Sequence, residues 1–391
     1  MVRKSVSAAI VGLGTTEYSK HSGRSELRLA VESCLAAIDD AGIEPSDVDG
    51  FVTFSLENSD ESTLARNLGI DEVSFFARTA AGGGGAPGAI ALAEMAIATG
   101  KAKTVICYRA MNERSGFRFG QPMSFAGKGE PTTGSVDGSW SSPFGMTTPA
   151  SFMAHSARRY AHQYDVPVES FGLQPVVQRN YAVNNPDAFF FDRPMTLDDH
   201  QASRMIADPL RLLDCCQETD GAVALVLTSR ERAADLRRPV VTVLGTAMGI
   251  ADRQHGMATM YRDDIASVEE TRIVGDQLWR QTGLRAADMD VAILYDHFSP
   301  AVLMQLEALR FCGPGEAVAL VKEGGTAIDG IIPTNTNGGQ LSEAYMHGFN
   351  GIVEAVRQLR ATAVNQVHDA HHVVVTGGPY VATSGMILGR H

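Results

Sequence analysis

Apolar residues occur in two patterns along this chain: short continuous runs, and positions spaced along one face of a helix. The change from one pattern to the other predicts strands that alternate with helices. Residues 7–14, SAAIVGLG, form a short apolar run that ends in glycines and is typical of a buried strand. Between Leu27 and Ala41 the apolar residues fall on one face of a helix, which Gly42 is expected to end. Further strands are expected at residues 47–55, 72–79 and 104–113, and a further helix at about 87–99.

The second half of the chain repeats this order of elements. Residues 269–298 give a helix, a glycine, an acidic turn and a strand, as residues 26–55 do. A repeat of this length indicates gene duplication, and the alternation of strands and helices favours mainly parallel sheets with helices packed on them. We therefore expect an α/β fold made of two duplicated βαβ halves. The expected bounds are 1–235, which include an irregular loop region at 111–200, and 236–391.

Composition and charge narrow the class of protein. With 391 residues, 44% of them hydrophobic, the chain is long enough for two soluble domains with substantial cores. A net charge of -12 argues against nucleic acid or an anionic membrane as a partner. We find no charged-then-apolar leader and no apolar run of membrane-spanning length. Five cysteines without a C-x-x-C pair fit reduced thiols, so we expect a cytoplasmic protein.

Two stretches carry the candidate chemistry of the second half. Residues 335–351, NTNGGQLSEAYMHGFNG, begin with a polar turn and the pair Gly338 and Gly339, and a helix is expected at about 341–359. Glycines ahead of a helix let the backbone approach a ligand, which then faces the free N–H groups of the first turn. Residues 294–300, LYDHFSP, directly follow an apolar strand. The side chains of interest in the two stretches are Tyr295, Asp296, His297, Tyr345 and His347.

A third glycine cluster, residues 82–85, lies after a strand and before a helix. Its G-x-G-x-x-G spacing fits the dinucleotide-binding fingerprint, but a run of glycines satisfies almost any such spacing. A better interpretation is an oxyanion site at a helix N-terminus, formed by Gly83 and Gly84, with close helix–sheet packing as the alternative. Gly377 and Gly378 end the equivalent unit of the second half and are included among the candidate substrate-binding residues.

The segment at residues 111–149 is long, irregular and rich in Gly, Ser and Pro. Loops of this length in compact domains are usually functional or disordered. Its aromatic residues favour a folded flap that contributes to an apolar pocket, and a dimer contact is the alternative. These residues are Phe117, Phe119, Phe125, Trp140 and Phe144. His368, His371 and His372 lie in a polar connection, where we expect solvated side chains and no metal.

The two motifs resemble those of the thiolase superfamily. Residues 335–351 are similar to the thiolase motif in which Asn-x-x-Gly-Gly precedes Gly-His-Pro. Residues 294–300 are similar to the His-Asp-Cys-Phe box of the sterol-carrier-protein type of thiolase. The resemblance extends over nearly the whole chain, including residues 203–227. It implies a thiolase-like fold in five layers, αβαβα, and a homodimer.

The chain departs from thiolases at the residues that carry their chemistry. Tyr295 and Tyr345 replace the motif histidines, and residues 82–85 stand where the family has its nucleophilic cysteine. Val375 stands in the place of the C-terminal cysteine. Claisen cleavage through an acyl-enzyme needs a thiol. The chain is most similar to the lipid-transfer-protein branch, which includes retro-aldolases that cleave steroid side chains.

Retro-aldol cleavage of a β-hydroxyacyl-CoA thioester needs no thiol. A base takes the β-hydroxyl proton, the Cα–Cβ bond breaks, and an acid protonates Cα. We expect Tyr295 and Tyr345 to be catalytic, and Asp296, His297 and His347 to contact the substrate. A tyrosine with its ordinary pKa of about 10 needs help to act as a base. The resemblance implies a 17-hydroxy steroid side-chain CoA as substrate, a 17-ketosteroid and propionyl-CoA as products, and no cofactor beyond the CoA of the substrate.

Other functions remain open at this point. A non-catalytic acyl-CoA or lipid carrier would keep the pocket and lose the chemistry, and the two tyrosines would then only fill space. An acetyl-CoA acyltransferase of the thiolase type would need an unrecognised nucleophile, for which Cys312 is the candidate. The resemblance further implies a small partner protein with an OB-fold of the DUF35 type.

Overall fold

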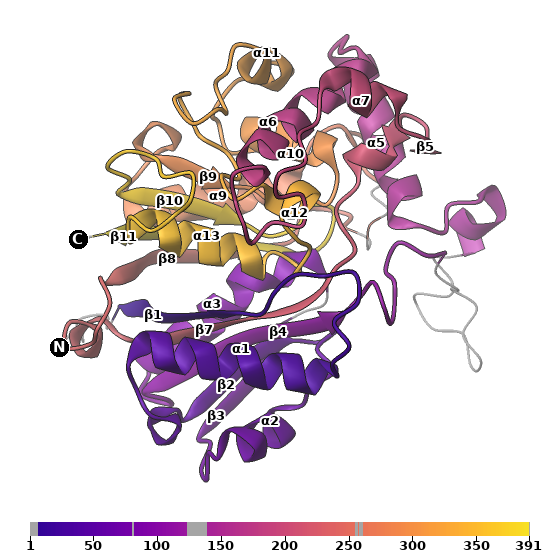
Figure 1. Cartoon of the computed structure of the whole chain (residues 1–391). Coiled ribbons are helices and arrows are strands. Elements are labelled where there is room, and N and C mark those ends of the chain that lie inside the picture. Colours follow the sequence, from indigo (N-terminus) through magenta and orange to yellow (C-terminus); the bar gives the residue numbers. More distant parts are fainter. Residues whose placement is uncertain (1–6, 80–81, 123–138, 255–256, 258–260, 391) are drawn as a thin grey trace.

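The computed structural model describes residues 7–79, 82–122, 139–254, 257 and 261–390 (Figure 1). The strands of the first half are β1 (Ala8–Thr15), β2 (Gly50–Phe54), β3 (Phe75–Thr79), β4 (Thr104–Asn112) and β7 (Asp220–Ser229). Those of the second half are β8 (Val241–Gly249), β9 (Val291–Ile293), β10 (His372–Thr376) and β11 (Thr383–Arg390). A separate two-stranded sheet consists of β5 (Met205–Ala207) and β6 (Leu210–Arg211).

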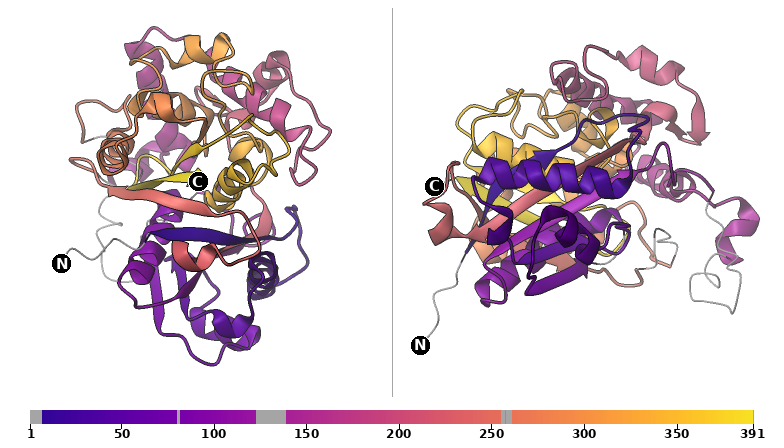
Figure 2. Two further views of the ribbon diagram at one scale, coloured as in Figure 1. Left: turned by 90° about the vertical axis from the view of Figure 1, so that its left-hand side faces the viewer. Right: turned by 60° about the horizontal axis from the view of Figure 1, so that its bottom comes forward.

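Within the described residues the main strands form one sheet in the order β3-β2-β4-β7-β1-β8-β11-β10-β9. The order in the second half mirrors that in the first about the β1–β8 boundary, as the repeat predicts. Thr334 takes the place of a missing strand through a parallel bridge to Ala292. β1 and β8 pair through two residue pairs only, and Figure 2 shows them side by side where the two halves meet.

The sheet is mixed, so the expectation of mainly parallel sheets is wrong. β2 runs parallel to β3 and β4, and β9 runs parallel to β10. β7 and β11 run antiparallel to both of their neighbours. β11 follows β10 after the short connection 377–382, and a connection this short can only return the chain antiparallel. Apolar runs predict where strands lie, but they do not predict whether neighbouring strands run parallel or antiparallel.

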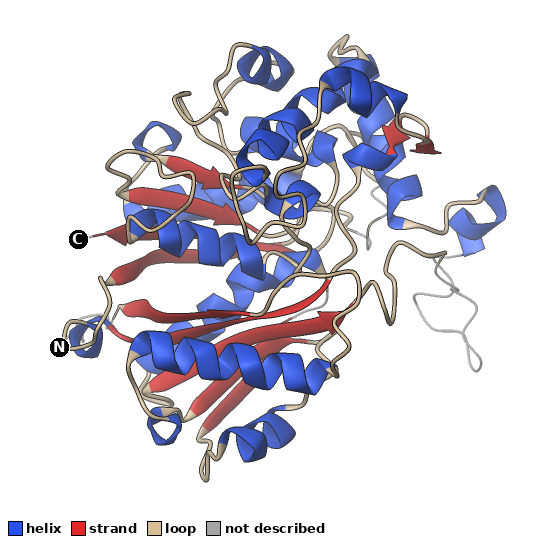
Figure 3. Ribbon diagram, viewed as in Figure 1, coloured by secondary structure: helices blue, strands red, loops and turns tan. Residues whose placement is uncertain are grey.

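Successive side chains of a strand point to opposite faces, and the core clusters follow this alternation. The covering helices are α1 (Glu26–Ala41), α3 (Ala86–Ala98), α9 (Glu269–Thr282), α10 (Ser299–Ala308) and α13 (Phe349–Leu359). In β4, Val105 and Cys107 pack with α3 and α13, whereas Ile106 and Tyr108 pack with α1. In β9, Ala292 packs with α9 and α10. Helices therefore lie outside and between the two halves of the sheet, which gives the five layers expected (Figure 3).

Three helices of the loop region, α5 (Pro149–Gln163), α6 (Leu173–Ala182) and α7 (Leu197–Ala202), lie over the second half of the molecule. Met153 and Ala157 of α5 share a core cluster with Leu303 and Leu306 of α10. The remaining helices are α2 (Glu61–Leu68), α8 (Arg230–Ala233), α11 (Ala317–Lys322) and α12 (Gly339–Ser342). In the part of the chain described here, none of these helices has the length and apolar character needed to cross a membrane.

The aromatic residues of the 111–149 segment do not form the flap that we expected. The exposed fraction of the side chain is 71% for Phe117, 68% for Trp140 and 82% for Phe144. Phe117 packs edge-on against Phe119, with ring centroids 5.1 Å apart. Phe119 alone packs inward, against His347, with ring centroids 5.0 Å apart. Phe125 lies outside the described residues.

Candidate active site

Tyr295 is the second residue after the end of β9, and its backbone is fixed on both sides. Its N–H donates to Thr376 Oγ1 at 3.1 Å, and its C=O accepts from Gln305 Nε2 at 2.7 Å. Thr376 Oγ1 in turn donates to Gln305 Oε1 at 2.7 Å. The side chain is buried in the layer between the two halves of the sheet. The position of the Tyr295 ring is thus set by strand ends and a helix, not by a free loop.

Tyr345 reaches the same place from an interrupted helix. The helix expected at 341–359 is broken, because residues 343–348 leave the helical path between α12 and α13. Gly348, with φ of 89°, adopts a left-handed backbone that restarts the helix. Thr219 Oγ1 holds the Tyr345 backbone, accepting from its N–H at 3.0 Å and donating to its C=O at 3.2 Å.

The two tyrosine hydroxyls are hydrogen-bonded to each other. Their oxygens are 3.0 Å apart, with the rings nearly perpendicular at 76°. Burial raises the pKa of Tyr295 well above its ordinary value, and the hydrogen bond from Tyr345 lowers it by a smaller amount. Burial, and then the neighbouring Tyr295, raise the pKa of Tyr345 well above its ordinary value. Both hydroxyls are therefore protonated at neutral pH.

Glycines form the slot in which the Tyr295 ring sits. A β-carbon at Gly83 would overlap the Tyr295 hydroxyl, and one at Gly348 or Gly378 would stand 3.2 or 3.1 Å from the ring. Gly378 N–H also donates to Gly83 C=O at 2.8 Å. Gly83 of the first half thus meets Gly378 of the second half at this ring.

Next to this slot, Gly84 and Gly377 let the backbone of the glycine cluster contact the backbone of residues 377–382. A β-carbon at Gly377 would stand 2.8 Å from Gly84 C=O, and one at Gly84 would overlap the C=O of Ala382. Gly84 C=O accepts a hydrogen bond from Ser384 Oγ. The role of the glycine cluster as an oxyanion site stays a prediction.

Asp296 and the pair Gly338–Gly339 belong to a buried cap at the start of α12. The Asp296 carboxylate accepts from the backbone N–H groups of Gln340 at 2.9 Å and Leu341 at 3.1 Å, and from Gln178 Nε2. A β-carbon at Gly339 would overlap this carboxylate. Burial raises the pKa of Asp296, and these donors lower it. The glycine pair therefore lets α12 close onto Asp296.

His297 and His347 are neutral imidazoles on either side of the tyrosine pair. The His297 ring centroid lies 5.3 Å from that of Tyr295, and its Nδ1 has no hydrogen-bond partner among the described residues. Burial lowers the pKa of His297 to about 3. The His347 ring centroid lies 4.8 Å from that of Tyr345. Burial, and then the Arg109 guanidinium, lower the pKa of His347 well below its ordinary value.

Several residues of the site were missed by the sequence analysis. Arg109 donates from Nε toward His347 Nδ1 at 3.4 Å and is paired with Glu57 at 2.9 Å. Glu113 is the first residue after β4, as Tyr295 is the second after β9, and this position was a usable signal. Nothing in the residue pattern points to Glu57, since its role depends on a contact with another strand.

Glu343 is a further missed residue, and it explains the break in the helix. Its carboxylate accepts hydrogen bonds from three asparagine side chains: Asn337, Asn350 at 2.9 Å and Asn185 at 3.2 Å. These bonds pull the segment after α12 inward, where it cannot continue the helix. Burial raises the pKa of Glu343 to about 8, and the Asn350 donor lowers it by a smaller amount.

A cavity of about 570 Å³ lies beside the segment that carries Tyr345. Its lining includes Glu343 and three cationic side chains, Lys20, Arg193 and Arg357. The Phe189 ring lies between two of these cations, with Lys20 Nζ 4.3 Å and the Arg193 guanidinium 4.6 Å from its centroid. The lining also includes Glu17 and Asp187, and Asp187 is paired with Arg357 at 3.2 Å, so the cavity offers cations, carboxylates and an aromatic face.

The chain matches known proteins over almost its whole length. Residues 251–390 match the family model described as thiolase C-terminal domain-like. The chain is 54% identical over 383 residues to the steroid side-chain-cleaving aldolase of Thermomonospora curvata, covering 98% of this chain and 97% of that protein. It is 52% identical over 382 residues to the 17-hydroxy-3-oxo-4-pregnene-20-carboxyl-CoA lyase of Mycobacterium tuberculosis, covering 98% and 99%.

A solved structure shows the same fold. The chain superposes on a chain of the Ltp2-ChsH2(DUF35) aldolase with a TM-score of 0.93 at 52% sequence identity, covering 98% of each. Identity and coverage at this level establish the family as well as the architecture. The chain belongs to the thiolase-like family of steroid side-chain-cleaving aldolases.

Proposed function

We propose that this protein cleaves the side chain of a 17-hydroxy steroid CoA thioester by a retro-aldol reaction, releasing a 17-ketosteroid and propionyl-CoA. The names of the two relatives above support the reaction and the substrate class. The observation that carries the mechanism is the 3.0 Å hydrogen bond between Tyr295 and Tyr345.

The tyrosine pair works as a proton relay. A lone buried tyrosinate is disfavoured, since burial raises the pKa of both hydroxyls. A hydrogen-bonded pair avoids this state: one tyrosine accepts the β-hydroxyl proton while it passes its own proton to the other, which protonates Cα. The O–H electrons become the new C=O bond, and the Cα–Cβ electrons pass through the enolate into the new C–H bond. Both tyrosines end neutral.

The neutral imidazoles suit this chemistry. His347, beside Tyr345, and His297, beside Tyr295, add no positive charge that would trap a tyrosinate. Nδ1 of His297, which has no partner among the described residues, is available to a substrate oxygen. The backbone of the glycine cluster at Gly83 and Gly84 supplies further donors for the enolate oxygen.

Thiolase chemistry is disfavoured by the state of the cysteines. Burial raises the pKa of Cys216, which lies near the tyrosine pair, well above its ordinary value. Burial also raises the pKa of Cys312 to about 12, and this thiol belongs to the edge of the outer core of the second half. Nucleophilic cysteines need a depressed pKa. A carrier without catalysis is disfavoured by the hydrogen-bonded hydroxyl pair, since space-filling would need only the rings.

The cavity beside Tyr345 receives the phosphates of the CoA moiety in this proposal. Lys20, Arg193 and Arg357 provide cations for phosphate oxygens, and the Phe189 ring provides an apolar face. The protein acts as a homodimer in the cytoplasm together with a small DUF35-type partner. The presence of DUF35 in the solved relative supports the partner.

A turnover assay tests the proposed function directly. The purified chain, alone and mixed with a DUF35-type partner, is incubated with a 17-hydroxy steroid side-chain CoA thioester, and 17-ketosteroid and propionyl-CoA are measured together. Equal amounts of both products support the proposal. Tight binding of the thioester without product, in the presence of the partner, would instead identify a carrier.

A further inference from the structure

Glu113 is a buried acid that the proposed mechanism leaves unused. It is the first residue after β4, and its side chain is 3% exposed. Its Oε2 has no hydrogen-bond partner among the described residues. A buried carboxyl oxygen without a partner is costly, so its retention calls for an explanation in the function of the site.

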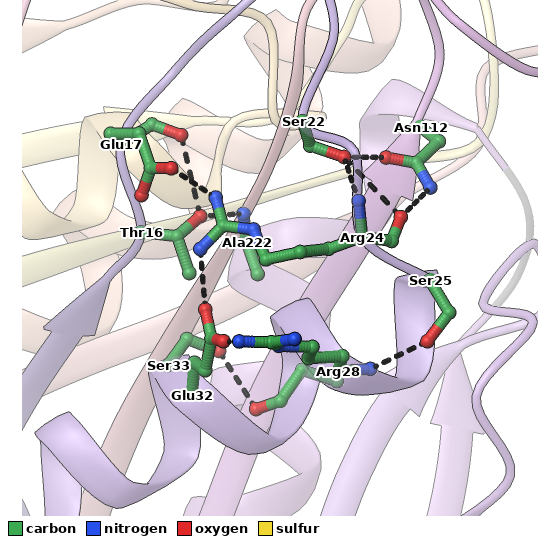
Figure 4. A network of polar contacts seen from close by, with 11 residues as sticks. Thr16, Glu17, Ser22, Arg24, Ser25, Arg28, Glu32, Ser33, Asn112 and Ala222 are labelled. Atoms are coloured by element: carbon green, nitrogen blue, oxygen red, sulfur yellow. Dashed lines mark hydrogen bonds and ion pairs between the residues drawn. The ribbon is translucent and has the colours of Figure 1, made fainter.

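The position of Glu113 is fixed by the strand that precedes it. Asn112 accepts a hydrogen bond from Ser22 Oγ at 2.8 Å and donates to Arg24 C=O at 2.7 Å (Figure 4). Asn112 N–H also donates to Glu26 Oε1 at 2.9 Å. These bonds tie the end of β4 to the start of α1. The Glu113 side chain therefore leaves a rigid point at the same sheet edge as Tyr295.

Glu113 contacts two of the segments that hold the residues around the tyrosine pair. Its charge contributes to the raised pKa of Tyr295, Tyr345 and Cys216 alike. The two backbone amides that favour its ionised form belong to Phe119, which packs on His347, and Thr219, which holds the Tyr345 backbone. Glu113 thus stands where the segments bearing the proposed catalytic residues converge.

The charges around Glu113 favour its protonated form. Arg109, the cation that lowers the pKa of Glu113, is already paired with Glu57 at 2.9 Å, and the neighbouring Glu218 is paired with Arg118 at 2.6 Å. Burial, and then Glu218, raise the pKa of Glu113 well above its ordinary value. The charged and titratable groups that act on Glu113 or feel its charge are Lys20, Arg109, Arg118, Cys216, Glu218, Tyr295 and Tyr345.

We propose that Glu113 takes part in the reaction as a neutral carboxylic acid, whose free oxygen donates a hydrogen bond to the thioester oxygen while the enolate forms. This role rests on the proposed retro-aldol function and adds a catalytic residue to it. A carboxylic acid held neutral by an apolar site is a strong donor toward an oxyanion. An ionised Glu113 would instead repel the enolate. Activity therefore falls as the pH rises through the range in which Glu113 loses its proton.

Three variants test this role in the assembled protein that turns over the steroid thioester. Glu113→Gln keeps a neutral donor, so kcat at neutral pH stays within about tenfold of wild type and the fall at alkaline pH disappears. Glu113→Ala loses the donor and lowers kcat by about 10²–10³ with little change in KM. Glu218→Gln removes a neighbouring negative charge, so the alkaline fall moves to lower pH. Thermal unfolding and acyl-CoA binding check that each variant is folded.

An infrared difference spectrum between wild type and Glu113→Gln provides a readout that does not depend on turnover. The carbonyl stretch of one protonated carboxylic acid is expected in wild type and absent in the variant. If wild type cleaves the thioester and Glu113→Ala does so at the same rate, the role of Glu113 is overturned and the proposed function stands. The role of Glu113 is also overturned if folded Glu113→Gln is as inactive as Glu113→Ala at every pH, or if the band is missing. A wild-type protein that never releases ketone would overturn the proposed function itself.

Discussion

Gly83 and the hydroxyl group of Tyr295 occupy adjoining space, so that a β-carbon at Gly83 would overlap the hydroxyl oxygen. The two residues come from different halves of the chain and meet in the layer between them. The glycine cluster therefore provides the space that the Tyr295 ring needs.

Gly83→Ala is expected to displace the Tyr295 ring and break its hydrogen bond to Tyr345. We predict a loss of kcat of about 10²-fold or more, since general acid–base help is worth about 10²–10⁴. Gly88→Ala, farther along the same segment, is the control, because its β-carbon meets nothing closer than 3.4 Å. Steady-state kinetics would contradict this account if both variants kept the wild-type kcat.

Thiol-alkylating agents are expected to leave turnover intact. Burial raises the pKa of Cys34, Cys107 and Cys216 well above the ordinary value, and raises that of Cys312 to about 12. Few thiolates are then present at neutral pH. Activity is measured after incubation with iodoacetamide, and mass spectrometry counts the modified cysteines. Stoichiometric inactivation that substrate prevents would restore a thiolase-type mechanism.

Arg193→Glu is expected to raise KM for the CoA thioester about tenfold or more and to leave kcat near wild type. The substitution places a negative charge in the cavity assigned to the CoA phosphates, whose lining includes neither Tyr295 nor Tyr345. Lys101→Glu is the matched control, since Lys101 is exposed and lies before β4 at the end opposite Glu113. An equal KM for both variants would place the CoA phosphates elsewhere.

Stability is expected to fall as the pH rises from about 4.5 to about 8. The pKa of Glu343 is raised from 4.5 to about 8, so in this range the folded state holds a proton that the unfolded state releases. The free energy of unfolding then decreases with pH. Melting temperatures across this range test the sign. Glu343→Gln, which cannot ionise, should show a shallower slope than wild type, and an unchanged slope would remove Glu343 as the cause.

Much of the site was predictable because it lies at element ends. Tyr295 follows an apolar strand and Tyr345 follows a glycine pair, and the internal repeat places both stretches at equivalent points. The two halves follow from the same repeat, and the five layers follow from the resemblance to thiolases. The direction of β7 and β11 was not predictable, since apolar patterns are the same for parallel and antiparallel strands.

The rest of the site depends on contacts between distant residues. The helix break before Tyr345 comes from the bonds of Glu343 to three asparagines, one of which, Asn185, lies in the other half of the chain. The burial of Glu113 depends on segments that the sequence gives no reason to place beside it. Trp140 and Phe144 show the reverse case, since aromatic residues in a loop predicted a covered surface, whereas both side chains are exposed among the described residues.

The central claim is that Tyr295 and Tyr345 move the proton as one hydrogen-bonded unit. The most direct measurement is the single-turnover rate of ketone release by Tyr295→Phe, Tyr345→Phe and the double variant. Tyr164→Phe is the control, because this hydroxyl accepts from Gln163 Nε2 at 3.2 Å at an exposed site. We predict that each single variant loses about 10²–10⁴ in rate, that the double variant is no slower than the singles, and that all still bind acyl-CoA. Wild-type rates in both single variants, or a double variant with the product of the two losses, would contradict the relay.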